Sequence, residues 1–293
     1  MELAPICLFT YNRLDETKRT IRALRKNNLA EQSEVFVFSD GAKEGVSDAK
    51  IKEVREFLKN VTGFKKFTIK ESPINKGLAN SIIDGVSEVI CKYGNVIVLE
   101  DDLITAPNYL NFMNEALNFY KNNVSIFSIS GYSMNLPSLN NLNKDYYLGV
   151  RASSWGWGTW SRSWTDIDWE VKDYDKFSTS VPLRKMFRRG GSDMPRMLDN
   201  QMNKKIDSWA IRWCYNQFKR GQYTVYPKVS KIESIGFGGA ATHTKKTKRF
   251  DTYLDVTNQS SFNFDEKCQI DNTLIKEFKN KFSIFSRFKD KLL

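Results

Sequence analysis

The chain has 293 residues, of which 41% are hydrophobic and 13% aromatic, so it can bury a large core and lacks the composition of a disordered protein. Its net charge of +11 indicates an anionic partner. However, the absence of zinc-finger spacings and RNA-binding aromatic motifs argues against nucleic acid. No apolar run of 18 residues and no secretory leader is found, so we expect a cytoplasmic protein without a membrane span.

Strand and helix patterns alternate through the first half of the chain. We expect strands at 5–11, 34–39, 64–70, 96–102 and 125–130, and helices at 15–27, 51–58, 80–93 and about 108–121. This alternation predicts an α/β fold with a mainly parallel sheet and helices on both faces. Ligands of such sheets bind beyond the carboxyl ends of the strands.

The segment 96–102, VIVLEDD, carries an acidic cluster to that edge of the sheet. Four apolar residues suited to a buried strand run directly into Glu100, Asp101 and Asp102. Like charges packed this closely repel one another unless a cation or hydrogen-bond donors lie among them. Mg²⁺ and Mn²⁺ are often held by one or two carboxylates together with substrate phosphates, so the cluster predicts a metal–diphosphate site. The alternative is a solvated acidic turn.

Polar residues also follow the other strands. Thr10, Tyr11 and Arg13 come at the end of the first strand, Asp40 after the second, and Lys76 after the third. These groups should meet the acidic cluster in one crevice. No GxGxxG follows the first strand and no GxxxxGK[ST] occurs, which argues against a dinucleotide dehydrogenase and a P-loop NTPase.

Four motifs in this order, TYNR, SDG, NKGLANS and LEDD, resemble the nucleotide-sugar half of a GT-A (Rossmann-like) glycosyltransferase. The resemblance is closest to inverting N-acetylglucosaminyltransferase I-type enzymes and to bacterial surface-polysaccharide (family 2-like) sugar transferases. It implies a nucleotide-sugar-binding half at 1–130, an acceptor-binding and catalytic half at 131–250, and a C-terminal extension at 251–293. The implied partners are a nucleotide-sugar donor, with UDP expected, and a glycan or lipid-linked glycan acceptor.

The resemblance also implies roles for the residues that bind the nucleotide. Arg13 and Asp40 would hold its uracil and ribose side, beside Thr10 and Tyr11, and Lys76 would add positive charge near the donor. Simpler interpretations stay open. Asp40 can form an ordinary turn with the glycine after it, Arg13 can pair with acidic residues of the next helix, and Lys76 can be a solvated loop charge.

For the metal, Mn²⁺ or Mg²⁺, the resemblance implies that Asp102 is a ligand, while Glu100 and Asp101 face the ribose or the donor sugar. A strand near 225 leads into a glycine-rich stretch that contains the only histidine, His243. The resembling bacterial enzymes have a similar stretch followed by His-Thr, so His243 is a candidate for binding metal or diphosphate. A structural or solvated histidine is the alternative.

Tryptophans and small residues alternate in the segment 150–164, VRASSWGWGTWSRSW. Aromatic faces separated by glycine and serine suit stacking on sugar rings and close approach of backbone to a ligand. In the resembling families a stretch with glycine and tryptophan at this point shapes the donor and acceptor pocket, which implies that role for Trp155, Gly156 and Trp157. The alternative is a core-packing segment.

A helix is expected over 204–221, beginning near Asp207. An Asp at this place can be a helix N-cap. The pattern Asp-x-Trp before a helix also resembles the segment that carries the catalytic base of inverting transferases, which removes the proton of the acceptor hydroxyl. Asp207 is our candidate for that base.

The tail, 273–293, has the pattern of a basic amphipathic helix. Such helices lie on anionic membranes, which would make the protein peripheral on the inner face of the membrane. Docking on the protein itself competes with this interpretation. For the whole chain, the alternatives to a transferase are a sugar-phosphate nucleotidyltransferase and a non-catalytic glycan- or membrane-binding protein.

Overall fold

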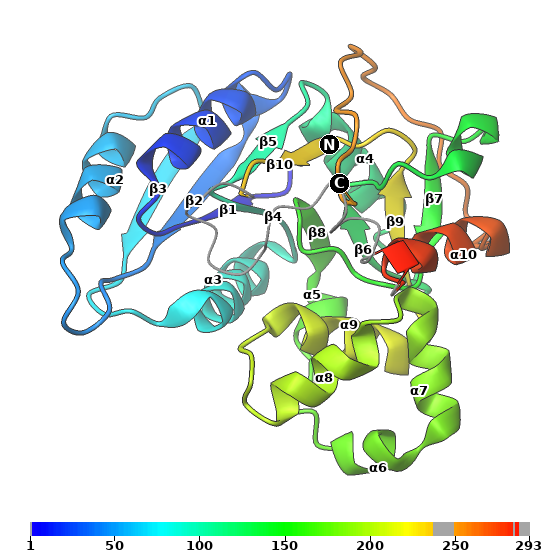
Figure 1. Cartoon of the computed structure of the whole chain (residues 1–293). Coiled ribbons are helices and arrows are strands. Elements are labelled where there is room, and N and C mark those ends of the chain that lie inside the picture. The colour runs from blue at the N-terminus through cyan, green and yellow to red at the C-terminus, as the bar shows by residue number, and fades with distance from the viewer. Residues whose placement is uncertain (1, 237–248, 284, 287–293) are drawn as a thin grey trace.

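A computed structural model describes residues 2–236, 249–283 and 285–286 (Figure 1). The strands are β1 (Ile6–Thr10), β2 (Glu34–Ser39), β3 (Lys66–Glu71), β4 (Asn95–Glu100), β5 (Leu103–Thr105), β6 (Ile126–Ser130), β7 (Tyr146–Gly149), β8 (Trp157–Trp160), β9 (Tyr223–Pro227) and β10 (Ile232–Ser234). The α-helices are α1 (Leu14–Arg25), α2 (Ala49–Lys59), α3 (Gly77–Tyr93), α4 (Tyr109–Phe119), α5 (Ser161–Trp164), α6 (Tyr174–Thr179), α7 (Val181–Phe187), α8 (Met194–Met202), α9 (Trp209–Lys219) and α10 (Asn272–Lys281). Short 3₁₀ turns include η1 (Ala30–Gln32), η2 (Pro137–Asn141) and η3 (Arg188–Gly190).

Eight of the described strands form one sheet in the order β3-β2-β1-β4-β8-β6-β9-β7. β1 to β4 run parallel to one another, whereas β8 is antiparallel to both of its neighbours, β4 and β6. β9 runs parallel to β6, and β7 is antiparallel to β9. Six strands therefore share one direction and only β7 and β8 oppose them, so the prediction of a mainly parallel α/β sheet is confirmed.

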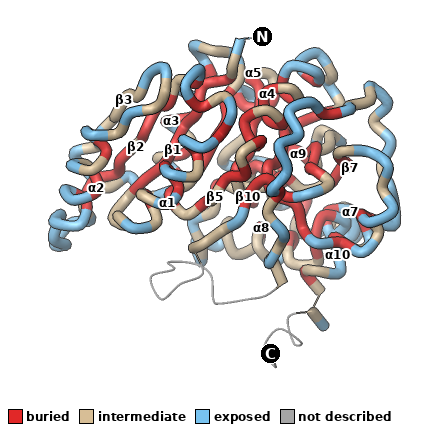
Figure 2. Tube along the Cα trace, turned by 90° about the horizontal axis from the view of Figure 1, so that it is seen from above, coloured by how far each residue is buried: buried red, intermediate tan, exposed pale blue. Residues whose placement is uncertain are grey.

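Helices cover both faces of this sheet, and the two faces bury separate apolar clusters. Side chains of α1, α2, α4 and α10 pack on one face, and those of α3 and α5 to α9 on the other. Alternation along β1 shows the division, since Ile6 and Leu8 point to the first cluster and Cys7 and Phe9 to the second. In Figure 2 buried backbone runs through the centre of the molecule, and exposed segments lie mainly at its periphery.

A small two-stranded sheet of β5 and β10 completes the site edge. β5 begins only three residues after β4 ends, and β10 pairs with it in antiparallel register, Ser234 opposite Leu103. A segment from the far end of the chain thus lies directly beside the acidic residues that follow β4. Figure 1 shows β5 and β10 side by side.

The tail helix α10 docks on the protein itself. Leu274, Phe278 and Phe282 are buried in the core cluster that α4 also lines. Glu277 accepts two hydrogen bonds from Ser138 of η2, at 2.7 and 3.1 Å. The apolar face of α10 is therefore covered by the protein, as the competing interpretation had it, and contact of the tail with a membrane stays a prediction. None of the helices within the described residues is long and apolar enough to cross a bilayer.

Candidate functional site

The centre of the site is a set of ionic contacts between the ends of β1 and β4. The guanidinium of Arg13, just before α1, pairs with the carboxylates of Asp101 and Asp102, the latter at 3.0 Å. The backbone N–H of Tyr11 donates to Asp101 Oδ2 at 3.3 Å. The sequence motifs TYNR and LEDD therefore meet, and pairing of Arg13 within its own helix is excluded. Thr10, at the end of β1, is buried beside them, and its hydroxyl has no hydrogen-bond partner among the described residues.

Three carboxylates share this edge with one arginine. Burial raises the pKa of Glu100 to about 8, and the charges of Asp102 and Asp101 add to the effect. Burial likewise raises the pKa of Asp101 to about 6, although Arg13 opposes the shift. Like charges in a poorly solvated position favour the protonated forms, and a second cation would reverse this preference. When all three carboxylates are ionised, they carry more negative charge than the single guanidinium of Arg13 balances.

The donor set suits a divalent cation only in part. Asp101 and Asp102 supply the carboxylate oxygens that Mg²⁺ and Mn²⁺ prefer. Within residues 2–236, 249–283 and 285–286, however, no group of three or more His, Cys, Asp or Glu side chains is arranged to hold a metal. The chemistry therefore fits an ion held by one or two carboxylates and completed by substrate oxygens and water. His243 lies outside the described residues.

Gly236 closes one side of the acidic cluster. The N–H of Ile235 donates to the carbonyl of Asp102 at 2.9 Å. A Cβ atom on Gly236 would come within 2.1 Å of Asp102 Oδ2, so any larger residue here would have to displace that carboxylate or the backbone. The glycine-rich stretch that follows β10 thus begins against Asp102.

Asp40, after β2, holds the loop before α3 in place. Its two carboxylate oxygens accept hydrogen bonds from the backbone N–H groups of Gly41, Lys76 and Gly77 at 2.9 to 3.0 Å. The side chain of Asn75 donates to it at 3.1 Å. Four donors fill the acceptor positions of the carboxylate. In this structure the side chain therefore shapes the NKG loop, and a contact of Asp40 with a nucleotide stays a prediction.

The ammonium of Lys76 points along α3 rather than toward the acidic cluster. It pairs with Asp84 at 2.9 Å on the protein surface, and this hydrogen bond raises the pKa of Lys76. A pocket of about 200 Å³ adjoins the loop. Its lining includes Asp40 and Lys76, but none of residues 100–102 and not Asp207. The lysine would have to change rotamer to reach a donor at the cluster.

The Trp-Gly-Trp segment divides between two environments. Trp157 is fully buried, with its ring 4.3 Å from that of Trp213 and 5.2 Å from that of Trp209. For Trp157 the alternative of a core-packing residue therefore holds, and its buried ring is not placed to stack on a sugar. Trp155 is partly buried beside Tyr132, at 4.7 Å between ring centroids.

Gly156 lies between these two tryptophans and has a left-handed backbone, with φ of 58°. Its carbonyl accepts the N–H of Gly131 at 2.6 Å. A Cβ here would meet the side chain of Ile232 at 2.5 Å. Glycine is therefore required both by the conformation and by the crossing of three segments at the end of β6.

Asp207 lies in the loop before α9, with a side chain that is 66% exposed. The helix cap is instead the neighbouring Ser208, whose hydroxyl accepts the N–H of Ile211 at 3.3 Å. The capping alternative for Asp207 is therefore wrong. Its ionic partner is Arg212, at 3.6 Å, and no backbone N–H of the described residues donates to this carboxylate.

Packing places the beginning of α9 near the carboxyl end of β4. Trp157 pairs with Val98 of β4, two residues before Glu100, and its ring packs on Trp209, the first residue of α9. Asp207 precedes Trp209 by two residues. The candidate base and the acidic cluster are thus connected through one layer of packed residues on the α3 face of the sheet.

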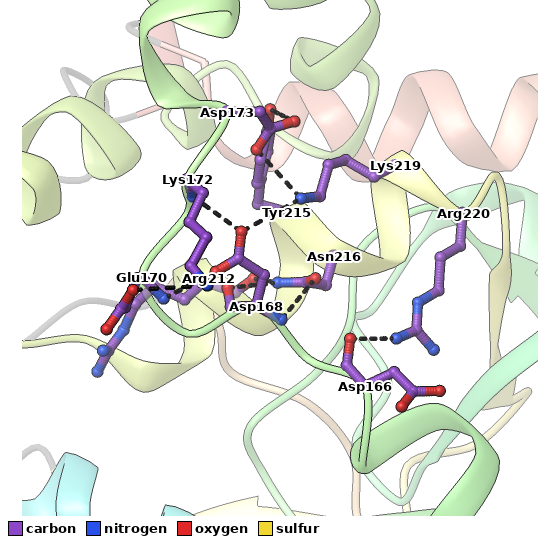
Figure 3. A network of polar contacts seen from close by, with 10 residues as sticks. All are labelled: Asp166, Asp168, Glu170, Lys172, Asp173, Arg212, Tyr215, Asn216, Lys219 and Arg220. Carbon is purple, nitrogen blue, oxygen red and sulfur yellow. Dashed lines mark hydrogen bonds and ion pairs between the residues drawn. The ribbon is translucent and has the colours of Figure 1, made fainter.

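A polar network fixes α9 against the segment 166–173 (Figure 3). Asn216 donates to the carbonyl of Asp168 at 3.1 Å and accepts the N–H of that residue at 3.2 Å. Lys219 pairs with Asp173 at 3.1 Å. Arg212 extends the network toward Asp207, since it also donates to the carbonyls of Ser208 and Trp169, both at 3.2 Å. Arg212 therefore connects the loop that carries Asp207 to the segment 166–173.

Three contributors to the site were missed by sequence reasoning. Gly236 belongs to the glycine-rich stretch before His243, but no pattern in the sequence indicates that it lies against Asp102. Arg212 has the ordinary spacing of a helix-surface residue. Arg55 of α2 donates to the carbonyls of Ser39, Asp40 and Ser72 at 2.8 to 3.2 Å and so ties the ends of β2 and β3 together. An isolated arginine on a helix gives no sequence signal for such a role.

Comparisons with known proteins identify a matching family and similar structures. A family model described as "Glycosyl transferase family 2" matches residues 6–190. No curated protein sequence matches the chain significantly. Solved structures that match the chain include a mannosyltransferase from Pyrobaculum calidifontis in complex with GDP-Man and Mn²⁺, at 11% identity and a TM-score of 0.39, covering 55% of this chain and 48% of the other. They also include S. aureus TarS, at 10% identity and a TM-score of 0.47, covering 80% of this chain and 37% of TarS. The chain thus spans less than half the length of either protein.

Proposed function

The chain belongs to glycosyl transferase family 2 and is a glycosyltransferase. From this premise we propose that it moves a sugar from a nucleotide donor to a hydroxyl group, with inversion at the anomeric carbon. We propose UDP as the nucleotide, and a glycan or lipid-linked glycan of bacterial surface polysaccharide synthesis as the acceptor. Family membership argues against a nucleotidyltransferase. It supports the family 2 part of the predicted resemblance, whereas likeness to N-acetylglucosaminyltransferase I stays a prediction.

The meeting of Arg13 with Asp101 and Asp102 at the carboxyl end of β4 is the observation that carries the proposal. It joins a cation and two carboxylates at the edge where parallel sheets bind ligands. Asp102 would hold Mn²⁺ or Mg²⁺, which would neutralise charge that develops on the departing diphosphate. Glu100 and Asp101 would contact the ribose or the donor sugar.

Besides pairing with Asp101 and Asp102, Arg13 would bind the donor in this proposal. Its guanidinium can hydrogen-bond phosphate oxygens as well as carboxylates. When the donor binds, the guanidinium of Arg13 would hold nucleotide phosphates, and the carboxylate of Asp102 would hold a metal. Asp40 would contribute by fixing the NKG loop, whose backbone and Lys76 border the nucleotide.

Asp207 would act as the general base. An inverting transfer requires that the acceptor hydroxyl loses its proton as its oxygen attacks the anomeric carbon from the side opposite the leaving group. The carboxylate of Asp207 is exposed and has Arg212 as its ionic partner, and within the described part of the chain no backbone N–H donates to it. It would therefore be able to receive that proton. Trp155 and Gly156 would shape the neighbouring wall of the pocket.

A donor panel tests the proposal. Release of free nucleotide is measured from UDP-, GDP- and CMP-sugars, with Mn²⁺ and with EDTA. Metal-dependent release from one UDP-sugar is the expected result and names the donor before an acceptor is known. Failure to release nucleotide from any donor, together with no nucleotide binding by calorimetry, would contradict the proposal and favour a non-catalytic binding protein.

A further inference from the structure

A basic and apolar surface lies on α7 and η3, at the end of the molecule away from α2 (Figure 1). We call it the α7 surface, and its exposed residues are Val181, Pro182, Lys185, Met186, Arg188 and Arg189. Val181 is 76% and Met186 55% exposed, although both are apolar. Residues 181–190 contain four basic and no acidic residues.

The inner side of α7 is firmly attached to the protein. Phe187 is buried between the rings of Phe177 and Tyr215. Arg184 forms a two-pronged ion pair with Asp199 of α8, at 2.7 and 2.8 Å. The outer side therefore stays exposed because the helix is anchored by its other face.

The three outer basic residues, Lys185, Arg188 and Arg189, form no ion pair with any described residue. The end of α10 extends the same surface, because Ser192, which follows η3, donates to the carbonyl of Phe282 at 2.6 Å. Lys276 and Lys279 are exposed on α10, and Phe285 beyond it is 89% exposed. Positive charge thus lies on both elements, and exposed apolar side chains lie on α7 and at Phe285.

We propose that the α7 surface binds the surface of an anionic lipid bilayer. Lys and Arg side chains are attracted to anionic headgroups, and apolar side chains among them enter the boundary between headgroups and acyl chains. A nucleic acid would match the charge, but it would leave Val181, Met186 and Phe285 without a favourable environment. The combination of the two kinds of side chain therefore favours lipid.

This proposal differs from membrane binding by an amphipathic tail. The apolar residues of α10 are buried, so that helix contributes basic residues and support, and the apolar contacts come from α7 and Phe285. Binding to lipid does not depend on the donor, the metal or Asp207. It can therefore be tested without any transferase activity.

The experiment measures co-sedimentation of the full chain with vesicles of phosphatidylcholine, with and without phosphatidylglycerol. One variant combines Lys185→Ser, Arg188→Ser and Arg189→Ser. The matched control combines Lys50→Ser, Lys52→Ser and Lys59→Ser on α2, which removes the same charge from an exposed helix at the opposite end of the sheet. A third variant, Val181→Ser with Met186→Ser, keeps the charge and removes the apolar side chains.

The wild type should bind only the anionic vesicles, and the α7 charge variant should lose at least about tenfold in affinity while the α2 control changes less than about twofold. The apolar variant should bind more weakly than the wild type at moderate salt, where charge attraction is screened. Equal losses in the two charge variants would show unspecific attraction by net charge and overturn the proposal. Absence of vesicle binding by the wild type, or loss of nucleic-acid binding alone in the α7 variant, would also overturn it.

Discussion

The backbone of Gly236 lies so close to the carboxylate of Asp102 that a Cβ atom at Gly236 would come within 2.1 Å of Asp102 Oδ2. Gly236 reaches this position because β10 pairs with β5, immediately after the acidic residues. A residue 134 positions later in the chain therefore controls the space around the proposed metal ligand. The contact connects the glycine-rich stretch to the nucleotide-binding half of the fold.

Substitution Gly236→Ala should weaken metal-dependent nucleotide binding by about tenfold or more, because the methyl group must displace either the backbone or the Asp102 carboxylate. Calorimetric titration with nucleotide and Mn²⁺ measures this. Gly221→Ala is the matched control, since Gly221 has φ of 64° but open space around its Cβ position. That control should lose some stability and keep nucleotide binding. Similar binding by both variants would show that Gly236 does not shape the site.

Asp207→Asn should lower turnover by roughly 10² to 10⁴ while nucleotide binding stays unchanged, because only the proton acceptor is lost. Ser208→Ala removes the real cap and should cost about 1 kcal/mol of stability with little effect on turnover. Transfer kinetics and thermal unfolding of both variants separate the two roles. If Asp207→Asn weakens nucleotide binding as much as it slows transfer, Asp207 is not the base.

Glu100 should make the metal-free protein less stable as the pH rises. Burial raises its pKa from 4.5 to about 8, so between these pH values the folded state keeps a proton that the unfolded state has released. The free energy of unfolding therefore falls over this range, and Glu100→Gln should remove roughly 1 to 3 kcal/mol of that fall. Urea unfolding in EDTA at about pH 5 and about pH 8 measures the difference. An identical pH dependence in both proteins would contradict the assignment.

A buried ion pair attaches the C-terminal extension to the sheet. Lys231, just before β10, pairs with Asp255, and both side chains are only 4% exposed. Burial lowers the pKa of Lys231 despite this partner. Burial alone would raise the pKa of Asp255, but Lys231, the N–H of Thr257 and the amide of Asn108 together keep it below its ordinary value.

Asp255→Asn should cost about 3 to 5 kcal/mol of stability, because it leaves the ammonium of Lys231 buried without a counter-charge. The double variant Lys231→Met with Asp255→Leu should recover most of this loss. The pKa of Asp255 is lowered by folding, so its contribution is present above pH 3.8 and is lost as the pH falls through the lower folded value. Denaturant unfolding measures each case. An equal loss in the single and double variants would contradict the role of the unpaired charge.

The parallel half of the fold was predictable because its helices and strands are long enough to show their periods. The strand Glu34–Ser39 has the expected bounds, and α3 begins three residues earlier than expected. The contact of Arg13 with the acidic residues was predictable, because parallel strands have their carboxyl ends at the same edge of the sheet. Local pattern and topology agree in this region.

The second half was less predictable for two physical reasons. β8 lies inside a tryptophan-rich segment that has no strand pattern by composition, and it forms because Trp157 and Trp160 fill opposite faces of the sheet while Gly158 lets α4 approach. Helices α5 to α8 have four to nine residues, which is too short for a clear helical period. The role of Asp40 as an acceptor for the NKG loop depends on a contact across 37 residues, which sequence spacing does not reveal.

The central claim is that the carboxyl end of β4 binds a nucleotide through a metal held by Asp102. Calorimetry of UDP with the wild type and with Asp102→Asn, each with Mn²⁺ and with EDTA, tests it most directly. Asp175→Asn, on the exposed part of α6, is the matched control. Binding that requires Mn²⁺ and weakens more than about tenfold only in Asp102→Asn is predicted. UDP binding that persists unchanged in Asp102→Asn and in EDTA would contradict the account.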